Sequence, residues 1–138
     1  MEIAEAGPSD LADIAVLYAE AGYGAVIDPS DTILVARHGG QLAGVVRLCA
    51  EEGVTVLRGM QVRAGFQRQG IGSRLLAACV PYFERRLTYC LPYTHLVDFY
   101  AAAGFAPVAA DVLPDFLVRR LSAYLAKGQQ VLAMRREA

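Results

Sequence analysis

The feature that most constrains the fold is a segment in which an extended strand passes through a glycine loop directly into an amphipathic helix. Residues 54–62 are rich in β-branched and apolar side chains, and Gly70 and Gly72 follow in a polar loop. Apolar side chains then recur at positions 75, 76, 79, 80 and 83, which is helical spacing. The first turn of such a helix has unpaired N–H groups and partial positive charge, so the loop is a candidate phosphate site.

The remaining pattern predicts an α/β fold with a mixed sheet and helices on its faces. A glycine turn at residues 38–41 separates two β-rich runs and predicts a hairpin, and Gly59 suggests a bulge in the third strand. Residues 22–30 are expected to form a loop that could lie over a ligand cleft. Pro81 is expected to kink the helix after the glycine loop or to end it early. Strands are predicted at residues 33–37, 42–48, 54–62, 87–91, 105–108 and 130–135, and further helices near residues 8–18, 96–103 and 114–126.

Composition fits one domain and argues against several classes of partner. The 138 residues are 55% hydrophobic, so we expect residues 1–138 to form one domain with a single packed core. A formal charge of -1 gives no net attraction to nucleic acid or to an anionic membrane, and no uncharged stretch approaches the roughly 20 residues that span a bilayer. The three cysteines are odd in number and lack C-x-x-C spacing. We therefore expect a cytoplasmic protein with no metal site.

The glycine loop can be compared with two known phosphate-binding motifs. A P-loop requires a lysine before its Ser or Thr, but Gly72 precedes Ser73 here. A dinucleotide-binding fingerprint requires a third glycine, where this chain has Leu75. Arg68 and Arg74 add positive charge, and Ser73 adds a hydroxyl donor. A plain structural loop or another nucleotide-binding fold stays open on these residues alone.

Two segments in order resemble motifs of the GNAT superfamily of N-acetyltransferases. Residues 62–73, V-R-A-G-F-Q-R-Q-G-I-G-S, are similar to the acetyl-coenzyme A motif [RQ]-x-x-G-x-[GA] of that family. Residues 98–105, D-F-Y-A-A-A-G-F, are similar to the family's F-Y-x-x-x-G-F segment. The order of the predicted strands also agrees with the family, so the resemblance covers nearly the whole chain. It implies a mixed, mostly antiparallel sheet flanked by helices on both faces.

The resemblance implies an N-acetyltransferase that moves an acetyl group from acetyl-coenzyme A to a primary amine by direct attack in a ternary complex. The acceptor would be a small-molecule or peptide amine, and a homodimer is compatible with the family although no sequence feature encodes one. Tyr100 would face the thioester sulfur and protonate the departing thiolate. The backbone would hold the pantetheine arm at Met60, Gln61 and Val62, and the pyrophosphate at Gln67, Arg68, Gln69, Gly70, Ile71, Gly72 and Ser73.

The chain departs from the family pattern at two positions. Val56 stands where some members have a glutamate base, and Tyr93 replaces an asparagine that helps to hold the cofactor; Thr94 or His95 could substitute. The general base is therefore unassigned, and a non-catalytic acyl-coenzyme A-binding or regulatory module is the alternative function.

Several side chains also have plain structural interpretations. Tyr100 could be a core aromatic residue, and Cys90 is expected to be buried and inert. Solvated positions are expected for Glu51, Glu52, Arg119 and Arg120.

Overall fold

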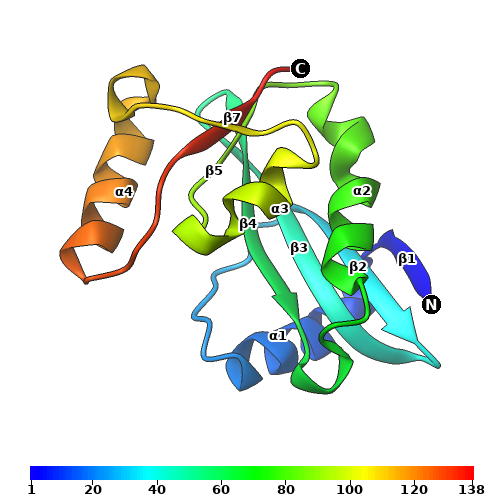
Figure 1. The fold of residues 1–138 in the computed structure, drawn as a ribbon. Helices are drawn as coiled ribbons and strands as arrows, with labels where there is room; N and C mark the ends of the chain where they lie inside the picture. The colour runs from blue at the N-terminus through cyan, green and yellow to red at the C-terminus, as the bar shows by residue number, and fades with distance from the viewer.

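A single seven-stranded sheet forms the centre of the molecule, with strands in the order β1-β2-β3-β4-β5-β7-β6 (Figure 1). The computed structural model describes all residues from Met1 to Ala138. Neighbouring strands are antiparallel except for β4 and β5, which are parallel, so the prediction of a mixed, mostly antiparallel sheet is confirmed. The strands are β1 (Glu2–Glu5), β2 (Thr32–His38), β3 (Gln41–Glu51), β4 (Val54–Val62), β5 (Thr88–Cys90), β6 (Ala106–Pro107) and β7 (Met134–Arg136).

Four α-helices cover both faces of this sheet, as predicted. Residues of α2 and α3 pack in one apolar cluster with Val46 and Leu48 of β3, whereas α1 packs with Val45. Because successive strand residues point to opposite faces, α1 lies across the sheet from α2. Helix α4 packs on Val56. Because Val56 pairs with Cys49, which points to the same face as Val45, α4 covers the same face of the sheet as α1. None of the helices is long and apolar enough to cross a membrane. Their bounds are α1 (Leu11–Glu20), α2 (Ile71–Phe83), α3 (Val97–Ala101) and α4 (Asp115–Ala126).

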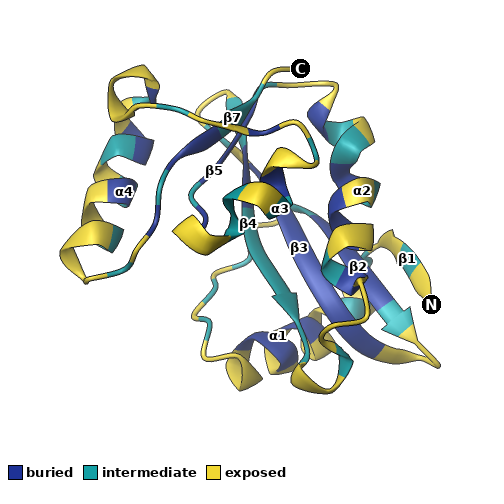
Figure 2. Ribbon diagram, viewed as in Figure 1, coloured by how far each residue is buried: buried dark blue, intermediate teal, exposed yellow.

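Strand β3 is the buried centre of the sheet (Figure 2). Its residues from Leu42 to Cys49 are all buried, because helices cover both of its faces. One of these buried residues is Arg47, which is only 2% exposed. A charged side chain in this position needs partners, and its surroundings are described with the site.

The expected bulge in β4 is present at Gly59. Val45 pairs with Gln61 and Arg47 pairs with Arg58, so Val46 faces both Gly59 and Met60. Gly59 has φ +64°, a conformation that glycine adopts without strain. The extra residue changes which β4 side chains face α2: Leu57 does so before the bulge, and Met60 and Val62 do so after it.

The structure differs from the predicted elements at both ends of the chain. Strand β1 was not predicted, since its four residues begin and end with glutamate and show too little pattern to identify a strand. The last strand begins at Met134 rather than at residue 130, because residues 130–132 bond to residues 92–94 instead of continuing the ladder with β5. Pro81 lies within α2, and the helix ends two residues later at Phe83.

Candidate functional site

Strands β4 and β5 diverge after a very short contact. They pair only at Thr55 with Thr88 and at Val56 with Tyr89, and β4 then continues to Val62 paired with β3 but not with β5. The chain after β5 turns instead toward the segment before β7, where the Leu132 N–H donates to the Pro92 carbonyl and the Thr94 N–H donates to the Gln130 carbonyl. The edge of β4 beyond Val56 is therefore left without a neighbouring strand.

The divergence opens a cleft of about 500 Å³, here called the β4–β5 cleft. This volume is in the range of small-molecule sites. The predicted residues Met60, Gln61 and Tyr100 line it, whereas Val62 and residues 67–73 do not. One wall is formed by residues 56–61 of β4. The others are formed by residues 90–93 and 96, by Tyr100 of α3, by the loop residues 21–24, and by residues 120, 124, 127, 129 and 131. The expected loop at residues 22–30 thus borders the cleft with its first residues.

The segment that leads into α2 has the geometry of an anion site. We call residues 68–73 the amide loop; its last three residues are the first residues of α2. None of its N–H groups donates a backbone hydrogen bond, and the Gly70 φ of +77° turns the chain into the 13-residue helix. Nothing lies within 4 Å of a Cβ built on Gly70, so this side of the loop is open. The free N–H groups and the positive end of the helix favour a bound anion such as pyrophosphate.

The amide loop and the cleft are joined through α3. A Cβ on Gly72 would lie 3.6 Å from the Phe99 ring and 3.9 Å from Val62, which are ordinary contacts. Phe99 in turn stacks edge-on against Tyr100, with ring centroids 5.0 Å apart. The two motifs that resemble the GNAT family are thus brought together, although about two dozen residues separate them in the sequence.

Tyr100 combines a core position with a place in the cleft wall. The residue is 5% exposed, packs edge-on against Phe105, and belongs to the cluster between the sheet and α2. Burial, with smaller contributions from Cys90 and Cys79, raises its pKa above the ordinary value of 10.0. Like an ordinary tyrosine, the hydroxyl is protonated at neutral pH and so carries a proton to donate, although the raised pKa makes it a weaker acid than a free tyrosine. It cannot act as a base under those conditions.

No carboxylate or imidazole lines the β4–β5 cleft. Val56, at the position of the family's glutamate, is 2% exposed and packs toward α4. Tyr93 borders the cleft and stacks on His95, with ring centroids 5.8 Å apart, but Thr94 and His95 are not part of the lining. The general base is therefore still unassigned. Cys90 is buried, as expected, and burial raises the pKa of its thiol.

An ion-pair cluster beside the cleft was not predicted from the sequence, and it corrects the expectation that Glu51 and Arg120 are solvated. Arg120 donates to both carboxylate oxygens of Glu51, at 2.6 and 3.1 Å, and Arg58 lies 3.7 Å from the same carboxylate. Glu51 and Arg120 are thus partners and not solvated side chains, while Arg119 is exposed as expected. Burial is the largest single influence and opposes ionisation of Glu51, but the hydrogen bond to Arg120 and the charges of Arg120, Arg58 and Arg47 together outweigh it and lower the pKa of the carboxyl.

The buried side chain of Arg47 binds the loop between α1 and β2. Arg47 donates through Nη1 to the Val26 carbonyl at 3.2 Å and to the Asp31 carboxylate at 3.1 Å, and through Nη2 to the Tyr23 hydroxyl at 3.4 Å. The Arg47 and Asp31 side chains are only 2% and 4% exposed. Tyr23 lines the cleft, so this buried arginine fixes one wall of the site to the central strand.

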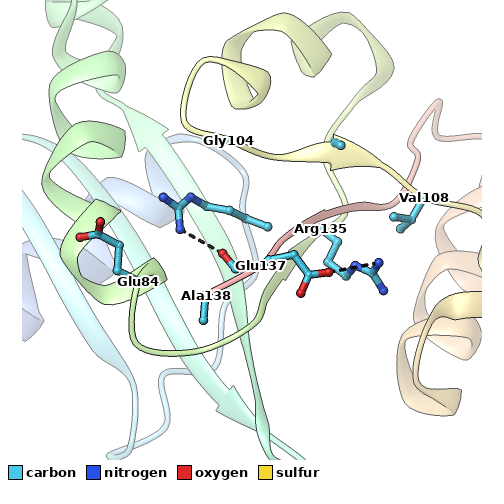
Figure 3. A pocket seen from close by; sticks show the side chains of 8 residues that line it. Glu84, Gly104, Val108, Arg135, Glu137 and Ala138 are labelled. Atoms are coloured by element: carbon cyan, nitrogen blue, oxygen red, sulfur yellow. Dashed lines mark hydrogen bonds and ion pairs between the residues drawn. The ribbon is translucent and has the colours of Figure 1, made fainter.

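A larger cavity, of about 640 Å³, lies at the other end of the sheet near the C-terminus (Figure 3). Its cations are already engaged: Arg136 donates to the carbonyls of Ala103 and Glu137, and Arg135 pairs with the Glu137 carboxylate at 3.3 Å. Neither motif contributes a predicted site residue to it. We therefore place the candidate site in the β4–β5 cleft and not in this larger cavity.

Comparisons with known proteins identify the family to which the fold belongs. Residues 29–107, more than half of the chain, match the sequence model of a family described as Acetyltransferase (GNAT) domain. A search of curated proteins finds no match.

Three solved structures illustrate the similarity of the fold. An acetyltransferase of the GNAT family from Streptococcus pneumoniae is 20% identical, with a TM-score of 0.73 over 98% of this chain and 97% of that one. An acyl-CoA N-acyltransferase from Pseudomonas aeruginosa is 20% identical, with a TM-score of 0.72 over 99% of both chains. N-acetylglutamate synthase from Neisseria gonorrhoeae, solved with coenzyme A and N-acetyl-glutamate, is 23% identical, with a TM-score of 0.69. That match covers 98% of this chain but 34% of the synthase.

Proposed function

Because the chain belongs to the GNAT acetyltransferase family, we propose that residues 1–138 act as one N-acetyltransferase domain that transfers an acetyl group from acetyl-coenzyme A to a primary amine. Acetyl-coenzyme A is the co-substrate of this family. The observation that carries the proposal is the connection between the open edge of β4, the amide loop and Tyr100. Together they provide a strand edge for an extended arm, donors for a pyrophosphate, and a proton donor between the two.

The chemical fit of the co-substrate can be judged from the free backbone groups. In this proposal the free N–H groups from Arg68 to Ser73 bind the pyrophosphate, and Arg68 and Arg74 add positive charge nearby. Gln67 precedes these donors, and its own N–H already donates to the Ala64 carbonyl at 3.5 Å. The backbone of Met60, Gln61 and Val62 binds the pantetheine arm, since an unpaired strand edge accepts an extended group as it would a neighbouring strand. The acetyl thioester then lies within the cleft.

The proposed reaction is a direct attack of the amine on the thioester carbonyl in a ternary complex. The neutral amine forms the new C–N bond, and a β4 N–H stabilises the oxyanion that develops. The C–S bond then breaks, and the Tyr100 hydroxyl gives a proton to the thiolate and regains one from solvent before the next turnover. The amine loses a proton to solvent or to an unassigned base, so free coenzyme A and the N-acetyl product are formed without a covalent enzyme intermediate.

A non-catalytic acyl-coenzyme A-binding or regulatory module is the second candidate. The observation that favours it is the absence of any carboxylate or imidazole from the cleft lining. A thiol-release assay with acetyl-coenzyme A and a panel of amines, polyamines and peptides separates the two functions. Release that depends on an added amine supports the enzyme, whereas tight binding without release supports the module.

The location of the co-substrate is tested by placing a negative charge in the amide loop. Gly70→Glu should lower the affinity for coenzyme A by about 100-fold or more, because the new carboxylate occupies and repels the pyrophosphate position. Gly70→Ala is the control for backbone strain, and Gly65→Glu adds the same charge to a nearby exposed glycine with open space around it. Isothermal titration calorimetry measures all three. Equal affinity of Gly70→Glu and Gly65→Glu would exclude the amide loop as the pyrophosphate site.

A further inference from the structure

The charged side chains that line the β4–β5 cleft all have the same sign. They are Arg58, Arg120 and Lys127, and no aspartate or glutamate accompanies them in the lining. Glu51 lies outside the lining and pairs with both arginines, so its single charge leaves the cleft with an excess of positive charge. Lys127 has no ion-pair partner and is exposed at the end of α4.

These cations lie across the sheet from the amide loop. Arg58 pairs in register with Arg47, whose side chain lies among the residues of α1 and the following loop. Arg120 and Lys127 belong to α4 and its last turn, which packs on that same face through Val56. The amide loop begins α2, which covers the opposite face. The cations are therefore on the opposite face of the sheet from the proposed pyrophosphate site, where they are free to contact a second substrate.

We propose that the acceptor is a small amine that carries a carboxylate, as an amino acid does, and that Lys127 and Arg58 bind this carboxylate. The inference rests on the proposed function and specifies its substrate class. A lysine ammonium without an ion-pair partner and a partly neutralised arginine both form charge-assisted hydrogen bonds to carboxylate oxygens. The remaining walls include Tyr23, Tyr93 and Tyr124, which offer apolar surface and hydroxyl groups to a small ligand.

The same positive charge has a consequence for the reacting nitrogen. A cationic cleft repels an ammonium group and attracts a carboxylate, so it favours the neutral amine that can attack the thioester. This effect would assist deprotonation in a cleft that has no carboxylate or imidazole base. Polyamines, which carry several positive charges and no carboxylate, should consequently be poor acceptors.

The test compares amino acids with their C-terminal amides as acceptors in the thiol-release assay. The two compounds of each pair share a side chain and an amine, and differ in the carboxylate. An α-amine loses basicity when the carboxylate is converted to an amide, which by itself favours reaction of the amide. A kcat/KM about tenfold or more higher for the acid therefore reports recognition of the carboxylate.

Two variants test whether side chains of the cleft cause the preference for the acid over the amide. Lys127→Gln and Arg58→Gln should each reduce the ratio of acid to amide by about fivefold, mainly through KM for the acceptor. Arg119→Gln is the matched control, because Arg119 is an exposed cation on α4 outside the lining and should leave the ratio unchanged. Coenzyme A affinity, measured by calorimetry, should be the same in all three variants.

The possible results separate the inference from the proposed function. Equal turnover of acids and amides, or equal effects of Lys127→Gln and Arg119→Gln, overturns the carboxylate site and leaves the acetyltransferase intact. If no amine in the panel produces thiol release, the proposed function is overturned. In that case, calorimetric titration of the acid and the amide into protein saturated with coenzyme A decides the inference: tighter binding of the acid that Lys127→Gln removes supports it, and equal binding overturns it.

Discussion

Gly59 is the position where one added methyl group should disturb both the fold and the site. A Cβ there would lie 2.5 Å from the Tyr18 hydroxyl oxygen and 3.1 Å from Arg47 Nε, and the backbone has φ +64°. Tyr18 also donates a hydrogen bond to the Gly59 carbonyl at 2.8 Å. Tyr18 is 3% exposed and packs within the α1 cluster, so it has little room to move away. Gly59→Ala should therefore displace Tyr18 or distort the bulge.

The expected loss of stability has two parts. An alanine held in the left-handed region costs about 1–2 kcal/mol relative to glycine. Loss of the Tyr18 hydrogen bond leaves buried polar groups unpaired, at about 1–3 kcal/mol. Alanine also restricts the unfolded chain, which offsets about 0.4–1 kcal/mol. We expect Gly59→Ala to lower the free energy of unfolding by about 2–4 kcal/mol in total.

Gly40→Ala is the matched control for this prediction. Gly40 has φ +83° in the β2–β3 turn, and nothing lies within 4 Å of its added Cβ, so this variant has the backbone strain without the contact. Urea unfolding followed by circular dichroism gives both free energies, and calorimetry gives coenzyme A affinity. Gly59→Ala should also weaken coenzyme A binding, because Gly59 lines the cleft. Equal destabilisation by the two variants would refute the assigned contact between Gly59 and Tyr18.

Three further predictions use the same unfolding and activity assays. Arg47→Met should cost about 3–5 kcal/mol of stability by leaving Asp31 buried without its partner, and adding Asp31→Asn should recover part of it; no recovery would contradict the pair. Glu51→Gln should destabilise the protein at pH 7 but less and less as pH falls below the ordinary pKa of 4.5, since a lowered carboxyl pKa stabilises the fold only while the group is ionised; a pH-independent difference would contradict this. Tyr100→Phe should lower kcat by about 100-fold or more with coenzyme A affinity nearly unchanged, and wild-type values of both would exclude Tyr100 as the acid.

The parts of the site that could be predicted are those encoded by neighbouring residues. The strand, the glycine loop and the amphipathic helix follow one another within residues 54–83, so spacing alone indicated their order and the free N–H groups of the helix start. Gly59 could be identified as a bulge for the same reason, since a glycine inside a strand often marks a bulge.

The charged partners of the site could not be predicted because they are distant in the sequence. Glu51 and Arg120 are 69 residues apart, and nothing near either residue distinguishes them from solvated charges. Arg47 stands in an apolar run that indicated a strand, but its burial depends on Asp31 and Tyr23, which belong to the segment between α1 and β2. Such pairs form only after the sheet brings α1, α4 and β3 together.

The position of the cleft follows from where β5 finds its hydrogen bonds. A parallel neighbour that continued beside β4 would occupy the edge of Met60 and Gln61, but β5 ends at Cys90 and residues 92–94 bond to residues 130–132. Those hydrogen bonds pair the backbone of the segment after β5 and leave the edge of β4 without a neighbouring strand. The bulge at Gly59 then turns Met60 toward α2 and leaves Gln61 on the face of α1. An extended ligand on this edge would thus have the amide loop at one end and the side chains of Arg58, Arg120 and Lys127 across the sheet, so the two proposed substrates would be bound by separate sets of groups.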